Sequence, residues 1–202
     1  MRLYIAPRAP NPRRVQMFVA EKGITGLELV NVDLNAQEHK GAAFRTKSPL
    51  ARVPALELDD GRVLTETRAI CTYLEGQHPE PNLMGRDATE RAFIEMADRR
   101  VEWYFLLPIG NCIRHTHPGL APLEQPQFPE FGRSQGEKLR ETAAWLDGEL
   151  QRQPWVAGER FTIADITAFC ALEFAKLMPF NARKEGFAAL QAWRDRMAER
   201  QN

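Results

Sequence analysis

The sequence lacks an excess of either charge and any long apolar run. Its 202 residues include 27 Lys plus Arg and 27 Asp plus Glu, so the formal net charge is zero. This balance argues against a protein that holds nucleic acid by bulk positive charge or a membrane by a polybasic anchor. No apolar run approaches the roughly 20 residues of a membrane span, and the first residues do not resemble a signal peptide. We therefore expect a cytoplasmic protein that binds neither nucleic acid nor membranes.

Cysteine is also scarce. Cys71, Cys112 and Cys170 are widely spaced, with no CxxC pair and no Cys/His cluster at metal-ligand spacing. A disulfide framework and a metal site are therefore not expected, and the three thiols are interpreted as buried packing residues. If the protein performs thiol chemistry, its own cysteines are not arranged for it.

What the sequence does contain is two differently patterned parts. Residues 1–78 alternate short apolar runs with helical spacing in the order β-α-β-α-β-β-α, which predicts a mixed sheet flanked by helices. Two prolines within three residues indicate a linker over 79–86. Residues 87–202 have helical spacing without a convincing strand. We expect strands at 3–5, 27–34, 53–58 and 62–64, and helices at 12–22, 66–75, 88–107, 136–150, 162–178 and 186–199.

Val53-Pro54 begins a strand that is expected to be central in the sheet. Proline cannot donate a hydrogen bond to a strand ladder, so its presence there needs a reason. One reason is a cis bond that turns the main chain of Val53 toward an extended peptide. The other is a strand-start proline without any ligand, and the local sequence leaves both open.

Two predicted helix starts carry polar groups that suit an anion. Asn11-Pro12 fits an N-cap followed by the first helical residue, and the helix N–H groups there would stabilise a thiolate. At Thr65-Glu66-Thr67, the helix N–H groups and the Thr67 hydroxyl suit a carboxylate, while Glu66 suits an adjacent amine. The pair would then recognise the end of an α-amino acid. Taken alone, it is more simply an N-cap with a well-placed acid.

The helical part carries fewer chemical signals. Thr162 and Asp165 have the spacing of a capping box, whose loss should cost stability of roughly 0.5–2 kcal/mol rather than catalysis. Arg114, His115 and His117 lie together without the further ligands that a metal would need. They are interpreted as a polar loop or helix end, or alternatively Arg114 or His115 contacts a substrate.

Together these motifs resemble the cytosolic glutathione transferase family over the whole chain, through their order and spacing. The resemblance implies a thioredoxin-like N-terminal domain, an all-α C-terminal domain, a homodimer, and glutathione as cosubstrate without a metal. The glutathione thiol would then supply the sulfur that the chain's own cysteines do not. The segments that carry the resemblance are Leu3 to Pro7, Pro10 to Val15, Ser48 to Leu56, Leu64 to Ile70, and Phe161 to Ile166.

The resemblance also implies a glutathione site. Pro54 matches the family's cis proline, so the main chain of Val53 would pair with the cysteinyl part of glutathione. Glu66 and Thr67 match the pair that binds the γ-glutamyl end, with Thr where Ser is more usual. The residues that match positions near the glycyl carboxylate are His39, Lys40 and Arg52.

The catalytic position departs from the family pattern. Many bacterial members place Ser, Thr or Cys just before the Pro-Asn step, where this chain has Ala9, so a hydroxyl-assisted mechanism through that residue is excluded. Asn11 resembles the Asn of nu-type members, which act more readily as glutathione-dependent disulfide reductases. We therefore expect Asn11 to be the catalytic residue. Tyr4 lies too early to be the catalytic tyrosine of other classes.

The implied function is a glutathione transferase, as in detoxification, that attacks a small hydrophobic electrophile or reduces a disulfide. The loss of the hydroxyl at Ala9 motivates one alternative, a non-catalytic binding or scaffold protein on the same fold. Another is a specialised glutathione-dependent lyase or isomerase. Candidates for contact with the electrophile, by placement alone, are Tyr104, Phe105, Arg114, His115 and Phe174.

Overall fold

The computed structural model describes residues 1–200; residues 201 and 202, the end of the expected helical domain, lie outside that range. The chain divides into two compact units, Met1–Leu83 and Met84–Asn202. The division falls inside the segment 79–86 that was expected to be a linker. Each unit is described separately below.

The N-terminal unit is built on a mixed sheet, as the sequence predicts. Within residues 1–200 the strands form one four-stranded sheet in the order β2-β1-β3-β4. β1 runs parallel to β2 and antiparallel to β3, and β3 pairs antiparallel with β4. The parallel pair requires a crossover, which α1 supplies, whereas β3 and β4 form a hairpin. The strands are β1 Arg2–Ile5, β2 Glu28–Asn31, β3 Ala55–Glu57 and β4 Val63–Thr65.

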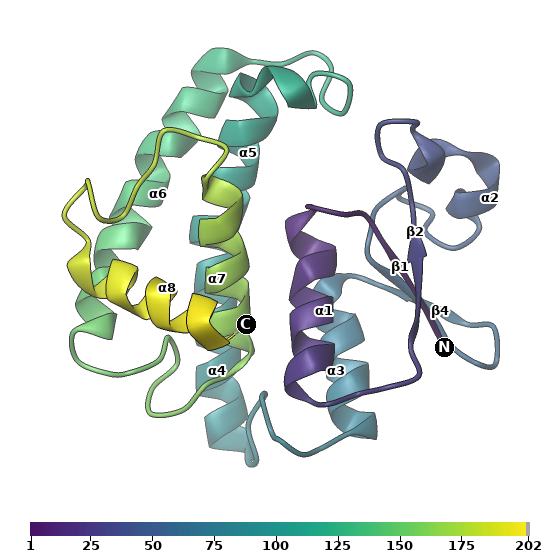
Figure 1. The fold of residues 1–202 in the computed structure, drawn as a ribbon, viewed down its shortest axis with the longest axis horizontal. Helices are drawn as coiled ribbons and strands as arrows, with labels where there is room; N and C mark the ends of the chain where they lie inside the picture. Colours follow the sequence, from purple (N-terminus) through teal and green to yellow (C-terminus); the bar gives the residue numbers. More distant parts are fainter. Residues whose placement is uncertain (201–202) are drawn as a thin grey trace. The chain divides into compact units, whose positions relative to one another are not determined.

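Helices cover both faces of this sheet. In Figure 1, α1 and α3 lie side by side on one face and α2 lies on the other. The alternation of β1 follows these layers: Leu3 and Ile5 are buried, and Tyr4 packs with Phe44 of α2. The helical segments are α1 Pro10–Glu21, η1 Glu38–Lys40, α2 Ala42–Arg45 and α3 Thr67–Gln77.

Two details of these helices differ from the sequence predictions. α1 begins at Pro10, with Ala9 as its N-cap, so Asn11 is the second helical residue and not the cap. Proline is tolerated throughout the first turn because the N–H groups there have no partner in the helix, so the start could not be fixed by Pro12 alone. In α3, Ala69 was expected to be buried but is exposed.

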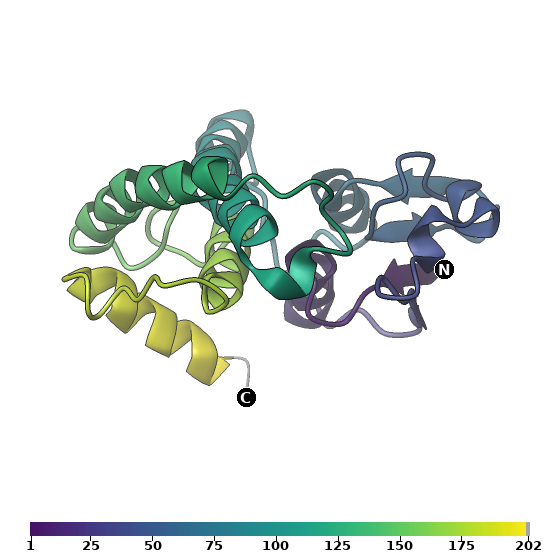
Figure 2. The same cartoon turned by 90° about the horizontal axis from the view of Figure 1, so that it is seen from above.

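The C-terminal unit is helical. α7 is almost wholly buried, as expected, and packs against α4, α5 and α8. α8 returns beside α6 after a long loop (Figures 1 and 2). None of the helices within residues 1–200 is long and apolar enough to cross a membrane. The elements are α4 Ala88–Val101, η2 Glu102–Leu106, α5 Leu107–Thr116, η3 Pro118–Leu120, α6 Pro129–Leu150, α7 Ile163–Ala175 and α8 Ala188–Arg200.

Three predictions for this unit are wrong wholly or in part. Pro108 does not interrupt a helix, because η2 is a π-helical turn that leads into α5 and places Pro108 in the first turn of α5. α6 begins at Pro129 instead of Gly136, which shortens the expected loop. The third prediction is wrong in part. The apolar spacing of 88–107 predicts one buried stripe, of which Ala97 and Val101 are buried, whereas Phe93 and Met96 of α4 and Tyr104 of η2 are exposed. The buried side of α4 consists of Ile94, Ala97, Asp98 and Val101.

Candidate functional site

The starts of α1 and α3 lie together in the N-terminal unit. The Thr67 hydroxyl donates to the main-chain oxygen of Asn11, with 3.4 Å between the two oxygens. Thr67 is buried, whereas Asn11 is exposed. The first N–H groups of a helix have no partner within it and carry a partial positive charge. The start of α3 therefore favours an anion, and α1 adds to it the N–H of Asn11 alone among its first three residues, because Pro10 and Pro12 have no N–H.

The side chain of Asn11 is held from within its own helix. Its Oδ1 accepts a hydrogen bond from Nη1 of Arg14 at 3.2 Å, one turn further along α1. The N-cap of α1 is Ala9, which makes no side-chain hydrogen bond because alanine has no polar group in its side chain. Asn11 therefore brings a polar side chain to a helix start whose cap has none.

The Glu66 backbone has an uncommon conformation. Glu66 is the N-cap of α3 at φ 67° and ψ 121°, and in the described chain it makes no side-chain capping hydrogen bond. Its side chain is exposed. A positive φ disfavours residues with a β-carbon, and such strain is found preferentially at functional sites. Glu66 thus occupies the N-cap position, as the simpler interpretation has it, but its carboxylate does not cap the helix.

Positive φ values recur beside the other candidate residues. Among residues 1–200, four non-glycine residues have a φ between 54° and 70°, and all four belong to the N-terminal unit. Each lies within three residues of a candidate site residue or is one itself. They are Arg8, Gln37, Ala51 and Glu66.

The Val53–Pro54 peptide bond is cis, as the first of the two alternatives requires, while the pairing of the Val53 main chain with a peptide stays a prediction. Pro54 is buried, and β3 begins only at Ala55, so Val53 precedes the strand ladder. The preceding turn is held by the Ser48 hydroxyl, which accepts from the main-chain nitrogen of Arg52 at 3.0 Å.

The three basic candidates lie on loops and on η1. His39 is buried, while Lys40 and Arg52 are exposed. The main-chain oxygen of Lys40 accepts from Nε of Arg45 at 3.1 Å, so α2 fixes the end of η1. The structure thus presents two exposed positive charges from this part of the unit.

Tyr4 lies on the α2 side of the sheet, where its side chain has a structural role. Its hydroxyl donates to Oε2 of Glu57 at 2.6 Å, and Lys47 donates to Oε1 of the same carboxylate at 2.6 Å. Burial and the bond to Glu57 raise the pKa of Tyr4, and the bonds from Lys47 and Tyr4 lower the pKa of Glu57. These contacts agree with the expectation that Tyr4 is not catalytic.

Comparison with known proteins identifies the family to which this chain is similar. A family model of the glutathione S-transferase N-terminal domain matches residues 3–82, and one of the C-terminal domain matches residues 115–201. Glutathione S-transferase 2 of Saccharomyces cerevisiae is 36% identical over 202 residues, which cover 99% of this chain and 86% of that protein. The chain belongs to the glutathione S-transferase family.

Solved structures similar to this chain support the same family assignment. A glutathione S-transferase domain-containing protein from Marinobacter aquaeolei is 40% identical, with a TM-score of 0.91 over 98% of this chain and 97% of its own. Gtt2 from Saccharomyces cerevisiae is 36% identical, with a TM-score of 0.92 over 98% and 95%. The thioredoxin-like N-terminal domain and helical C-terminal domain that the sequence predicted are thereby confirmed. The chain is a glutathione transferase, and glutathione is its cosubstrate.

The helical unit of this transferase engages its candidate residues in contacts of its own. The Arg114 guanidinium lies 3.2 Å from Glu124, and Nδ1 of His115 accepts from the main-chain nitrogen of Phe128 at 3.1 Å. Tyr104 is 60% exposed within η2. Of the two remaining candidates, Phe105 is buried and packs edge-on to Phe180, and Phe174 is half-buried.

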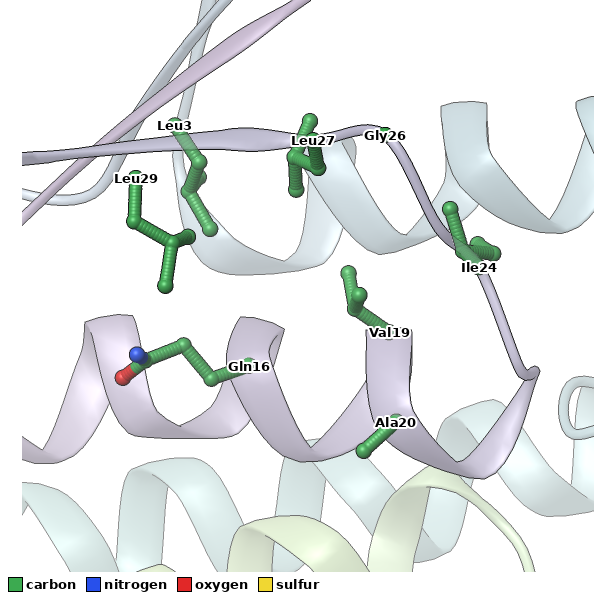
Figure 3. Close-up of a pocket in the computed structure, with 8 residues that line it drawn as sticks. All are labelled: Leu3, Gln16, Val19, Ala20, Ile24, Gly26, Leu27 and Leu29. Atoms are coloured by element: carbon green, nitrogen blue, oxygen red, sulfur yellow. The ribbon is translucent and has the colours of Figure 1, made fainter.

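Other parts of the transferase carry few groups that could take part in a reaction. A hollow of about 280 Å³ lies between α1 and β2 (Figure 3). Gln16 contributes a side-chain amide to its lining. Its remaining lining is Leu3, Val19, Ala20, Ile24, Gly26, Leu27 and Leu29. No cluster of three metal-ligating side chains occurs within residues 1–200. The three cysteines are free and buried, as the sequence predicts, and burial raises the pKa of Cys112.

Sequence reasoning missed Arg14. In the one-dimensional pattern it is an ordinary charged position on an amphipathic helix. Its spacing of three residues from Asn11 was the available signal, because residues three apart are neighbours on a helix surface. Only the structure shows that the side chain is buried and reaches the amide of Asn11.

Proposed function

We propose that the N-terminal unit binds glutathione across the starts of α1 and α3, with the γ-glutamyl end at Glu66 and Thr67. The observation that carries this proposal is the bond from Thr67 to the main chain of Asn11. It puts the position proposed for the γ-glutamyl carboxylate beside the position proposed for the thiol. Both groups are anions that helix N-termini favour, and the exposed carboxylate of Glu66 suits the ammonium group.

The rest of glutathione would lie along the loops that follow β2 and α2. The main chain of Val53 would pair with the cysteinyl part, since this residue precedes the β3 ladder. Lys40 and Arg52 are exposed and would attract the glycyl carboxylate. His39 is proposed as a third contact in this group, although its buried side chain makes it the least accessible of the three.

Asn11 is the proposed catalytic residue. A free thiol has a pKa of about 8.5, so most of it is protonated at neutral pH. The Asn11 side-chain amide is a hydrogen-bond donor, and together with the main-chain N–H of Asn11 and the positive end of the α1 dipole it would favour the thiolate; Pro10 and Pro12 have no N–H to add. Lowering the thiol pKa by one unit requires about 1.4 kcal/mol of preference for the charged form. One charge-assisted hydrogen bond supplies roughly that amount.

The activated thiolate would then attack a hydrophobic electrophile. Its electron pair forms a bond to an electrophilic carbon, and the leaving group departs with the electrons of the broken bond. With a disulfide substrate, the thiolate forms a mixed disulfide and releases the other sulfur as a thiolate. In the helical unit, Tyr104, Arg114 and His115 are the residues proposed to contact the electrophile.

A second candidate is a glutathione-dependent isomerase. It is favoured by one relative, the maleylacetoacetate isomerase of Pseudomonas aeruginosa, which is 38% identical over 206 aligned positions covering 96% of this chain and 86% of that protein. In such a reaction the thiolate would add to a conjugated cis double bond and leave again after rotation. Glutathione would be regenerated, with no net change in its oxidation state.

The proposed assembly is a cytoplasmic homodimer. The three reduced, buried cysteines suit a reducing compartment. The helical unit exposes a group of large apolar side chains along α4, η2 and α5, which is typical of an interface. This group consists of Phe93, Met96, Trp103 and Leu107. Sedimentation of the purified protein over a dilution series tests the assembly, and a monomer at every concentration would contradict it.

Binding is tested by thermal unfolding with increasing glutathione. A ligand at a hundred times its dissociation constant stabilises the native state by about 2.7 kcal/mol, so a clear rise in melting temperature is expected. Glu66→Ala should weaken this protection, and Glu28→Ala, on the exposed edge strand, is the matched control that should not. Absence of protection in the wild-type protein would overturn the proposed site.

Turnover separates the candidate reactions. The purified protein is assayed with glutathione and an aromatic halide, a mixed disulfide, a β-aryl ether, or a cis-configured conjugated keto acid. Conjugation or disulfide reduction supports the transferase proposal, and turnover of the keto acid alone supports the isomerase. Binding of glutathione without any turnover would support a scaffold role instead.

A further inference from the structure

Arg14 is a buried arginine close to the proposed catalytic residue. Its side chain belongs to α1, and only 1% of the residue's surface is exposed. Arginine is rarely buried because the removal of its charge from water is costly, so a buried arginine normally has a defined set of hydrogen-bond acceptors. One acceptor here is Oδ1 of Asn11, 3.2 Å from Nη1.

This contact decides which end of the Asn11 amide faces which way. An asparagine side chain has an accepting oxygen at one end and a donating NH₂ at the other. A guanidinium has only donors and keeps its charge at all accessible pH values, so it can pair only with the oxygen. The nitrogen of Asn11 must then be directed away from Arg14.

The orientation matters because a thiolate is an acceptor. An amide that presents its nitrogen stabilises a thiolate, and the same amide turned by 180° presents oxygen lone pairs and repels it. Asn11 is exposed, and nothing in its covalent structure prefers one orientation. The Thr67 hydroxyl restrains the main chain of Asn11, not its amide. The hydrogen bond from Arg14 is what restrains the amide.

We infer that Arg14 is a positioning residue, which fixes the Asn11 amide with its NH₂ group available to the glutathione thiolate. This inference rests on the proposed role of Asn11. Arg14 also polarises the amide, because a positive donor on its oxygen increases the positive charge on its NH₂ group. The effect of Arg14 on the thiol therefore passes through Asn11.

A double-mutant cycle on the intact enzyme tests this inference. The readout is the pH titration of the ultraviolet absorbance of the thiolate of bound glutathione, measured at saturating glutathione. Asn11→Ala is expected to raise the thiol pKa by about one unit, the size of one lost hydrogen bond to the charged form. Arg14→Met should raise it by a similar amount. Asn11→Ala combined with Arg14→Met should raise it no further than Asn11→Ala alone.

Two other variants keep the test informative if Arg14→Met fails to fold. Arg14→Lys retains the charge and a donor, and it should restore at least half of the wild-type shift. Asn11→Asp retains a partner for Arg14 but offers the thiolate no donor. It should fold as stably as the wild type and raise the thiol pKa by more than Asn11→Ala does.

The outcomes separate this inference from the proposed function. If Asn11→Ala raises the thiol pKa but Arg14→Met does not, Arg14 does not position the amide and the inference is wrong while the role of Asn11 stands. If the effects of Asn11→Ala and Arg14→Met add, Arg14 acts directly on the thiolate, which also overturns the inference. If Asn11→Ala leaves the thiol pKa unchanged, the proposed role of Asn11 is wrong and the inference falls with it.

Discussion

Two helices of this chain begin with a threonine and a carboxylate, and the two starts are organised in opposite ways. At α7, Thr162 and Asp165 form a complete capping box, and both are buried. At α3, within the described chain, Glu66 caps the helix without a side-chain hydrogen bond, and its carboxylate is exposed. Side chains that satisfy their own helix serve stability. A start that leaves its N–H groups to other partners is suited to a ligand.

The same contrast extends to the two units. In the C-terminal unit, buried polar groups join one helix to another, as where the Thr167 hydroxyl donates to Asp98 of α4 at 2.5 Å. The main-chain nitrogen of Leu190 likewise donates to Asp147 of α6 at 2.9 Å. In the N-terminal unit, the candidate polar groups stand on loops and helix starts beside residues with positive φ. The predictions below test whether this division of roles holds.

The largest expected effect is on α7. The Asp165 carboxylate accepts from the main-chain nitrogens of Val156 and Thr162, each at 2.9 Å, and from Nε1 of Trp193 at 3.2 Å. Asp165→Ala leaves these buried donors unpaired, so the free energy of unfolding should fall by about 3–5 kcal/mol, more than a capping box alone supplies. Urea unfolding measures the loss. A loss below about 1 kcal/mol would contradict this role for the carboxylate.

The second effect concerns pH. Burial raises the pKa of Asp165 to about 6, although its hydrogen bonds partly oppose the shift. The folded state therefore binds more protons than the unfolded state between the ordinary pKa of 3.8 and about 6, and the stability from this group is lost as pH rises through that window. Asp165→Asn removes the titrating carboxyl group, and with it this pH dependence of the free energy of unfolding. The stability difference between wild type and Asp165→Asn should narrow by about 2 kcal/mol between about pH 4.5 and about pH 7.

Urea unfolding of both proteins across this range provides the check. The direction in which the stability difference changes with pH decides between two physical causes. A difference that widened as pH rose would mean that the hydrogen bonds to the carboxylate outweigh its burial, and that the ionised form is the preferred buried state.

A matched pair of threonines compares the two helix starts directly. Thr162→Ala should lower the free energy of unfolding by about 1 kcal/mol and leave glutathione affinity unchanged, because a cap is lost. On binding, the Thr67 hydroxyl would exchange its acceptor, the main-chain oxygen of Asn11, for the γ-glutamyl carboxylate, because it has one proton to donate. Thr67→Ala should therefore weaken glutathione binding about tenfold and change stability by less than about 1 kcal/mol. Calorimetric titration and urea unfolding of each variant give both quantities. Equal effects of the two variants on binding would remove the contrast between α3 and α7.

The parts of the fold that the sequence predicted depend on local patterns. Alternating apolar residues located the strands, and the segment Asp59-Asp60-Gly61, whose Asp-Gly pair suits a tight turn, located the hairpin. The spacing of Thr162 and Asp165 located the start of α7. The errors arose where tertiary packing chose among equivalent patterns. α4 has apolar residues on more than one side, and packing buried Ile94 together with the expected Val101 but left Phe93 exposed.

The candidate site shows the same limit. Motif spacing selected Asn11, Glu66 and Thr67 as residues, but it does not state how their side chains or backbones are held. The bond between Arg14 and Asn11 depends on the burial of a charged side chain, and the backbone of Glu66 depends on the junction between β4 and α3. Neither is encoded in a short window of sequence.

The smallest expected effect concerns the backbone beside the basic candidates. Gln37 has φ 58° and ψ 25°, a left-handed conformation in which a β-carbon is unfavourable, and it directly precedes η1 with His39 and Lys40. Gln37→Gly should therefore raise the free energy of unfolding by about 0.5–1 kcal/mol, the net of released strain and the greater freedom of glycine in the unfolded chain. Gln37→Ala removes the same side chain but keeps the β-carbon, so it should give no gain. If the strain serves the site, Gln37→Gly should also weaken glutathione binding by about two- to threefold, because η1 is then less firmly placed. A gain in stability with unchanged affinity would show that the strain at Gln37 belongs to the fold and not to the ligand, and the division of roles between the two units would then fail at this loop.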